Sequence, residues 1–174
     1  MDADGVAARI RWVDGFPRPG VRFADLSPVI ADGHAFAWTI ETITNFADDL
    51  GVTKIAGIES RGFWFAAPVA DRLQVGMVPI RKAGRLPYVT YATEVVLEYG
   101  TATLEVHQDG AGPGDRVLVI DDVLATGGTA AAGCHLVEMT GASVAGVAVV
   151  VELAALGGRG ALPEAAPLFS LVIA

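Results

Sequence analysis

The residues best suited to chemistry lie in one short segment, where two aspartates precede a loop of glycine and threonine. An apolar run ends at Asp121 and Asp122, and residues 125–129 read Ala-Thr-Gly-Gly-Thr. Glycines let the backbone approach an anion and direct successive N–H groups at it. A helix beginning at the end of this loop would add about half a positive charge. The segment therefore predicts a phosphate-binding loop made of Ala125, Thr126, Gly127, Gly128 and Thr129.

The two carboxylates indicate what accompanies the phosphate. Anions beside a phosphate site repel the ligand unless they meet hydroxyl groups or a cation. A ribose offers two adjacent hydroxyl donors, so we expect Asp121 and Asp122 to accept from them while the loop holds the 5-phosphate. The alternative is a solvated turn at the end of a strand. It is the better interpretation of an aspartate pair alone, but not of the whole segment 119–129. The Gly-Lys-Ser/Thr and Gly-x-Gly-x-x-Gly patterns of other nucleotide sites do not occur in this segment.

Alternating strands and helices must position this segment. Continuous apolar runs predict strands over residues 54–58, 78–80, 116–120 and 144–151, with an edge strand over 168–173. Apolar periodicity and composition predict helices over 36–50, 63–73 and 127–140, and a short helix-forming entry segment over 1–15. Residues 82–104 read as a long excursion with hairpin character. The pattern predicts an α/β fold, with a mostly parallel sheet flanked by helices and a ligand beyond the carboxyl ends of the strands.

Composition narrows the class of protein. The 174 residues suggest a single domain, and the net charge of −8 disfavours nucleic acid as a partner. The one cysteine, Cys134, lies in an alanine-rich run and is expected in the core rather than as a nucleophile. The N-terminus is acidic without an apolar stretch, and no apolar run approaches the ~20 residues of a membrane span. We therefore expect a cytoplasmic protein with no membrane partner.

The segment 119–129 is very similar to the motif with which type I phosphoribosyltransferases bind 5-phosphoribosyl 1-diphosphate (PRPP). Further motifs between about Phe16 and Leu171 resemble the adenine phosphoribosyltransferases within that family. The resemblance implies the type I phosphoribosyltransferase fold and a purine-salvage reaction in which adenine and PRPP give AMP and diphosphate. It also implies a homodimer, and Mg²⁺ carried by PRPP rather than held directly by the protein.

Two segments resemble the hood that covers the base in this family. Residues 16–28 form the first part, and the resemblance implies that Phe23 stacks on adenine while backbone groups of Arg22 and Ala24 read its edge. Residues 152–163 form the second part, in which Leu153 is implied to pack on the other face of the base.

Two further segments resemble the machinery for the leaving group. Glu59-Ser60-Arg61-Gly62 is similar to the family's diphosphate loop, where a non-proline cis peptide is frequent. Arg61 and Lys82 are implied to bind the diphosphate. Residues 82–104 resemble the mobile catalytic loop, with Glu98 managing the proton of adenine and Tyr99 helping to close the site. Without that context, a glutamate in a loop would be read as a solvated surface group.

Other functions share parts of this pattern. The PRPP motif alone is equally compatible with transfer to hypoxanthine, guanine, xanthine or orotate, whereas the hood motifs favour adenine. A non-catalytic regulator that senses nucleotides and binds RNA or DNA is disfavoured by the acidic charge and by Lys82 and Glu98. A third alternative binds PRPP or transfers diphosphate without any dependence on a base. Ala24, Ala83 and Gly160 depart from the residues usual in the family.

Overall fold

The computed structural model describes residues 1–97 and 100–174 of the chain. Its helices are α1 (Ala3–Ala7), α2 (Ser27–Ala31), α3 (Gly33–Asp49), α4 (Gly62–Leu73) and α5 (Gly128–Met139). Its strands are β1 (Arg11–Asp14), β2 (Arg22–Asp25), β3 (Lys54–Ile58), β4 (Gly76–Lys82), β5 (Thr90–Leu97), β6 (Gly100–His107), β7 (Arg116–Leu124), β8 (Ser143–Glu152) and β9 (Leu168–Ile173). Two 3₁₀ turns, η1 (Ala154–Leu156) and η2 (Gly158–Ala161), follow β8.

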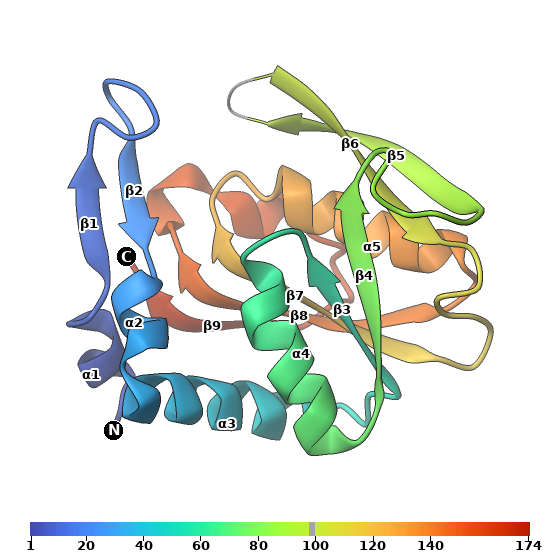
Figure 1. Cartoon of the computed structure of the whole chain (residues 1–174), viewed down its shortest axis with the longest axis horizontal. Helices are drawn as coiled ribbons and strands as arrows, with labels where there is room; N and C mark the ends of the chain where they lie inside the picture. The colour runs from blue at the N-terminus through green and yellow to red at the C-terminus, as the bar shows by residue number, and fades with distance from the viewer. Residues whose placement is uncertain (98–99) are drawn as a thin grey trace.

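Seven of the described strands form one sheet in the order β5-β6-β4-β3-β7-β8-β9 (Figure 1). The five from β4 to β9 in this order are parallel, while β6 pairs antiparallel with both β4 and β5. This is the predicted α/β fold with a mostly parallel sheet flanked by helices, and the predicted edge position of β9 is confirmed. The strand order reverses between β3 and β7, which is where ligands bind in open parallel sheets.

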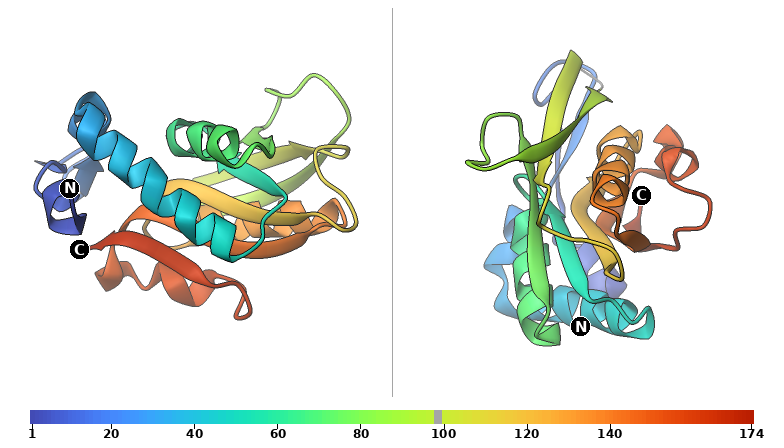
Figure 2. Two further views of the ribbon diagram at one scale, coloured as in Figure 1. Left: turned by 90° about the horizontal axis from the view of Figure 1, so that it is seen from below. Right: turned by 90° about the vertical axis from the view of Figure 1, so that its right-hand side faces the viewer.

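Helices cover both faces of the sheet because its central strands are apolar on both sides. In β7, Leu118 and Ile120 pack in a core with α3 and α4, whereas Val117 and Val119 pack in a second core with α5. Figure 2 shows these helices on opposite sides of the strands. Cys134 is fully buried in the second core, as expected. Burial and the nearby charge of Glu138 raise the pKa of its thiol to about 12.

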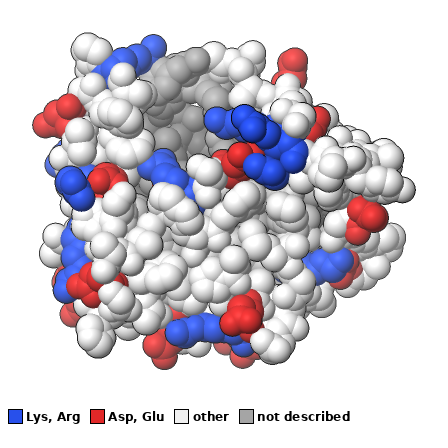
Figure 3. Space-filling model, in the orientation of Figure 1, with Lys and Arg blue, Asp and Glu red and all other residues white. Residues whose placement is uncertain are grey.

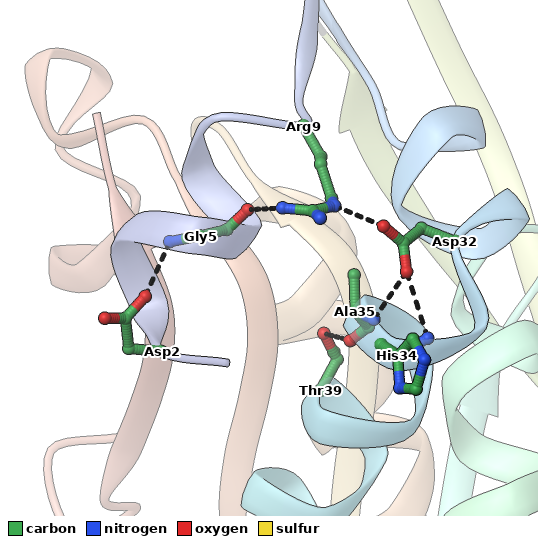
Figure 4. A network of polar contacts seen from close by, with 7 residues as sticks. All are labelled: Asp2, Gly5, Arg9, Asp32, His34, Ala35 and Thr39. Carbon is green, nitrogen blue, oxygen red and sulfur yellow. Dashed lines mark hydrogen bonds and ion pairs between the residues drawn. The ribbon is translucent and has the colours of Figure 1, made fainter.

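A polar network fixes the N-terminal segment against α3 (Figure 4). Asp32 caps α3 by accepting from the backbone N–H groups of His34 and Ala35, at 3.0 and 3.1 Å. Its other oxygen accepts from Arg9 Nε at 2.6 Å, and Arg9 Nη1 donates to the Gly5 carbonyl at 2.7 Å. The network therefore joins α1 to α3 just before the chain enters β1.

The first 25 residues differ from the sequence expectation. Residues 1–15 were expected to be helix-forming, but α1 covers only Ala3–Ala7 and β1 follows at Arg11–Asp14. β1 pairs antiparallel with β2, and Arg22 stacks on Trp12 with its guanidinium carbon 4.6 Å from the ring centre. These contacts join residues eight to fourteen positions apart, so helix propensity, which depends on near neighbours, does not predict them.

β7 also differs, because it continues through the two aspartates to Leu124 instead of ending at them. Asp121 pairs with Val149 and Leu124 with Glu152 of β8, so the ladder holds this backbone in register. In contrast, β3 has the predicted bounds, and α4 begins one residue earlier than expected and runs through Pro68.

No helix in residues 1–97 or 100–174 is long and apolar enough to cross a membrane.

Candidate active site

A cavity of about 1020 Å³ opens at the carboxyl ends of β3, β7 and β8, beside the β1–β2 pair. It brings together twelve of the residues predicted from the sequence: Arg22, Phe23, Ala24, Arg61, Asp121, Asp122, Ala125, Thr126, Gly127, Gly128, Thr129 and Leu153. Lys82 does not line it, and the predicted Glu98 and Tyr99 lie outside the described residues. The cavity therefore combines the predicted phosphate, ribose and base residues.

The aspartate pair is buried at the centre of the cavity wall. Asp121 and Asp122 are 8% and 4% exposed, and the backbone N–H of Asp122 donates to Asp121 Oδ1 at 2.9 Å. Burial, followed by the adjacent charge of Asp122, raises the pKa of Asp121 well above its ordinary value. Burial also raises the pKa of Asp122, although the positive charge of Arg61 opposes the shift. Hydroxyl donors would stabilise this pair, because a hydrogen bond donated to a carboxylate favours its charged form.

Glycine at position 62 allows α4 to begin directly against this pair. A Cβ there would lie 2.7 Å from the Ile120 carbonyl oxygen and 3.2 Å from Asp121 Oδ1. The first distance is too short for a side chain and the second is tight, so the first turn of α4 and the end of β7 touch through backbone. This contact places Arg61, the residue before α4, over the aspartates.

Arg61 bridges the aspartate pair and Phe23. Its Nε lies 2.8 Å from Asp122 Oδ2, and its guanidinium carbon lies 4.6 Å from the centre of the Phe23 ring. The approach to Oδ2 is off the direction of a hydrogen bond, so this buried oxygen has no hydrogen-bond partner among the described residues. The Glu59–Ser60 peptide bond just before Arg61 is cis, as expected from the resemblance.

The phosphate-binding loop depends on a close contact with the segment after β8. Gly127 has φ +86° and caps the N-terminus of α5, a conformation that favours glycine. A Cβ on Gly158 would lie 2.9 Å from the Gly127 nitrogen and collide with the Ala125 carbonyl oxygen. The loop and η2 therefore meet backbone to backbone, and glycine is needed on both sides.

An ion pair between the buried Glu152 and the exposed Arg159 holds the segment that makes this contact. Glu152, at the end of β8, accepts from Arg159 Nε at 3.1 Å and Nη2 at 2.7 Å, and from Ser170 Oγ at 2.6 Å. The hydrogen bond from Arg159, and then that from Ser170, lower the pKa of Glu152 despite its burial. The carboxylate thus connects β8, η2 and β9 beside Leu153.

The cavity wall near Phe23 includes Trp12, which the sequence did not single out. Phe16 packs edge-on against Phe23, with ring centres 5.0 Å apart, and Trp12 lies opposite Ala24 in the β1–β2 register. The C-terminal residue Ala174 also lines the cavity, because β9 is parallel to β8 and ends at the same edge. Residues 11–14 (Arg-Trp-Val-Asp) and 22–25 (Arg-Phe-Ala-Asp) do not alternate between polar and apolar residues as a half-buried strand does, so no clear sequence signal marks this pair of strands.

Lys82 lies at the end of β4, outside the cavity, in a group of charged residues. Glu59 accepts from the Lys82 backbone N–H at 2.9 Å and from Arg81 at 3.2 and 3.3 Å, and Arg81 donates to the Arg85 carbonyl. Burial alone would raise the pKa of Glu59, but these hydrogen bonds outweigh it and lower the pKa. Figure 3 shows basic side chains gathered beside acidic ones near this end of β4. Glu59 therefore ties the loop containing Arg61 to the segment containing Lys82.

The excursion over 82–104 contains the predicted hairpin. β5 and β6 pair from Thr90 with His107 to Leu97 with Gly100, and Val95 and Leu104 are buried in the core that contains α5. In Figure 1 this hairpin and the β1–β2 pair stand on opposite sides of the carboxyl ends of the central strands.

Comparisons with known proteins identify the family. Residues 29–167 match the phosphoribosyl transferase domain. An adenine phosphoribosyltransferase of Chloroflexus aurantiacus is 51% identical over 99% of both chains, and one of Roseiflexus is 52% identical over 96% of both. The chain belongs to the adenine phosphoribosyltransferase family.

Solved structures of the family agree with this fold over nearly the whole chain. The adenine phosphoribosyltransferase of Rhodothermus marinus has a TM-score of 0.93 at 44% identity, covering 99% of this chain and 98% of its own. The enzyme of Giardia lamblia, solved with 9-deazaadenine, has a TM-score of 0.95 at 36% identity, covering 100% and 98%. The predicted family and type I phosphoribosyltransferase fold are therefore confirmed.

Proposed function

We propose that this protein transfers the phosphoribosyl group of PRPP to adenine, forming AMP and diphosphate. The observation that carries the proposal is the placement of the aspartate pair, the loop 125–129 and Phe23 around one cavity. Its dimensions suit a ligand with a phosphate, a ribose and a flat base, since ligand pockets commonly span about 300–1,000 Å³. The family relationship supports adenine as the base.

The 5-phosphate and the ribose are held by adjacent parts of the chain. Backbone N–H groups of residues 125–129 and the N-terminus of α5 bind the phosphate, with hydroxyl donors from Thr126 and Thr129. Asp121 and Asp122 accept from the 2- and 3-hydroxyl groups of the ribose. Their negative charge also stabilises positive charge that develops at the anomeric carbon as the bond to diphosphate breaks.

Adenine lies in the hood formed by residues 16–28 and 152–163. Phe23 stacks on one face of the base, Leu153 packs on the other, and backbone groups of Arg22 and Ala24 read its edge. The β1–β2 pairing supports this arrangement, because it fixes Ala24 opposite Trp12. Orientation of the ring nitrogen toward the anomeric carbon supplies the proximity that the transfer needs.

The diphosphate leaves toward Arg61 and Lys82, whose charges stabilise it. Mg²⁺ fits this arrangement as an ion shared with PRPP, because magnesium prefers oxygen ligands and Asp121 and Asp122 line the cavity. No group of three or more His, Cys, Asp or Glu side chains in residues 1–97 and 100–174 could hold a metal ion by itself, so the substrate's own oxygens would supply the other ligands. When bound, the ion neutralises charge on the leaving diphosphate.

Glu98 manages the proton lost from adenine, and Tyr99 helps the segment 82–104 to close and exclude water.

We further propose that the protein is a single domain that acts in the cytoplasm as a homodimer. The dimer rests on the family relationship, and the location rests on the single cysteine, which cannot form an internal disulfide. Its substrates are the small molecules PRPP and adenine, and the net charge of −8 argues against a nucleic-acid partner.

The proposal is tested by incubating the purified protein with PRPP and Mg²⁺ and supplying adenine, hypoxanthine, guanine or orotate in separate reactions. Chromatography should detect AMP from adenine alone and no product when Mg²⁺ is omitted. Another nucleotide would preserve the PRPP site but overturn the assignment of the hood. Binding of PRPP without any product would exclude the enzyme and favour the regulator. Glu98→Gln is the first variant to examine in an active protein.

A further inference from the structure

Arg61 occupies the places where two parts of the substrate are expected. Its guanidinium group lies over the Phe23 ring at 4.6 Å, which is stacking distance for a planar cation. The same group contacts Asp122, a carboxylate expected to receive a ribose hydroxyl, at 2.8 Å. Adenine stacked on this face of Phe23 and a ribose at Asp122 therefore both compete with the Arg61 side chain.

The electrostatics favour this position when no diphosphate is present. Asp122 is buried, and a buried carboxylate gains from a nearby cation that offsets its lost hydration. The charge of Arg61 opposes the upward pKa shift of both Asp121 and Asp122, and it also lowers the pKa of Asp25. The cation is thus attracted by three carboxylates on the base and ribose side of the cavity.

A diphosphate would change this balance. It carries several negative charges, and a guanidinium offers a planar set of donors that matches phosphate oxygens. The contact with Asp122 is off the direction of a hydrogen bond, so moving to a diphosphate gives up an ion pair but no well-aligned hydrogen bond. Arg61 is 31% exposed, and a partly exposed side chain is free to change rotamer.

We propose that Arg61 couples the two subsites: in the free protein it covers Phe23 and Asp122, and a bound diphosphate draws it away and opens the adenine position. This inference rests on the proposed function of the cavity and adds that the binding of one ligand affects the binding of the other. Diphosphate and adenine bind with positive cooperativity through one side chain. By linkage, each ligand tightens the binding of the other by the same factor.

Calorimetric titration of the full chain with adenine tests the coupling, using inorganic pyrophosphate with Mg²⁺ as the second ligand. In the wild-type protein, saturating pyrophosphate should tighten adenine binding by roughly 5- to 30-fold, the factor expected for releasing a partly desolvated cation–π contact. In Arg61→Ala, adenine should bind the free protein more tightly than in wild type, by a similar factor. Pyrophosphate should then have no further effect on adenine binding.

Lys82→Met is the matched control, because Lys82 is the second cation proposed to bind diphosphate but lies outside the cavity that contains Phe23 and Asp122. It should weaken pyrophosphate binding while leaving adenine binding to the free protein unchanged, with the wild-type coupling restored at saturating pyrophosphate. Thermal unfolding of each variant checks that the fold is retained. Arg61→Lys provides a second test, since its ammonium can pair with Asp122 but cannot stack flat, and should retain only part of the coupling.

An unchanged adenine affinity in Arg61→Ala would overturn the proposal and leave Arg61 as a diphosphate ligand alone. Coupling that persists in Arg61→Ala would assign it to other residues and would equally refute the inference. Either result, in a protein that forms AMP from adenine and PRPP, leaves the proposed function intact. Absence of adenine binding and of AMP in the wild-type protein would instead refute the proposed function itself.

Discussion

Replacing Gly158 with alanine should displace the phosphate-binding loop. The added Cβ would lie 2.9 Å from the Gly127 nitrogen and nearer still to the Ala125 carbonyl oxygen. A carbon normally approaches a carbonyl oxygen to about 3.3–3.6 Å, so the two backbones must separate by roughly 1 Å. Neither neighbour is the flexible end of a side chain, so the loop or η2 has to move as a unit.

The separation has a calculable effect on catalysis. A misplacement of about 1 Å in a positioning element can cost on the order of 100-fold in rate. We therefore expect kcat/KM for PRPP to fall about 100-fold in Gly158→Ala, with a loss of stability of about 1–3 kcal/mol from overpacking. The assay is AMP formation with PRPP varied at saturating adenine, accompanied by thermal unfolding.

Gly160→Ala is the matched control, because a Cβ at Gly160 would meet nothing within 4 Å. Its kcat/KM for PRPP should stay within about twofold of wild type, since surface substitutions away from packed contacts change stability by only about 0.5 kcal/mol. Equal kinetics for Gly158→Ala and Gly160→Ala would refute the claim that the contact between η2 and residues 125–127 sets the loop.

Three further predictions follow from buried groups. Because the pKa of Asp121 is raised in the folded protein, its carboxyl opposes folding once the pH exceeds its ordinary pKa of about 3.9. Asp121→Asn should therefore raise the melting temperature at pH 7–8, and this gain should vanish near pH 4. An equal gain at both pH values would contradict the assignment. The lowered pKa of Glu152 has the opposite sign, so Glu152→Gln should lose about 1–2 kcal/mol of stability at pH 7. This loss should shrink as the pH falls below the ordinary glutamate pKa of about 4.3 and disappear below the lowered pKa of the folded protein, which urea unfolding over this pH range measures. Cys134 should resist a thiol reagent in the native protein and react after denaturation, so rapid native labelling would show that this part of the core opens.

The central sheet was largely predictable because its strands are buried on both faces. Continuous apolar runs marked β3 and β8, and their bounds differ from the expectation by at most one residue. The β1–β2 pair was not predictable in this way. Its strands are short, and their contacts, such as Arg22 on Trp12, join residues that local patterns treat separately.

The loop 125–129 and the aspartate pair were singled out from residue types and spacing, because a site for a phosphate and a ribose would need those groups together. The contacts of Arg61 with Asp122 and Phe23 were not evident, since they depend on where the ends of β3, β7 and β2 meet. The approach of Gly158 to Gly127 is a backbone contact between segments thirty residues apart, and a glycine gives no sign in the sequence of which partner it faces.

A crystal structure of the protein with AMP bound is the most direct test of the central claim that this cavity holds the nucleotide. We predict the phosphate at the N–H groups of residues 125–129, the ribose hydroxyls at Asp121 and Asp122, and the base on Phe23 in place of the Arg61 guanidinium. AMP bound outside the cavity, or inside it with the ribose away from both aspartates, would contradict the account.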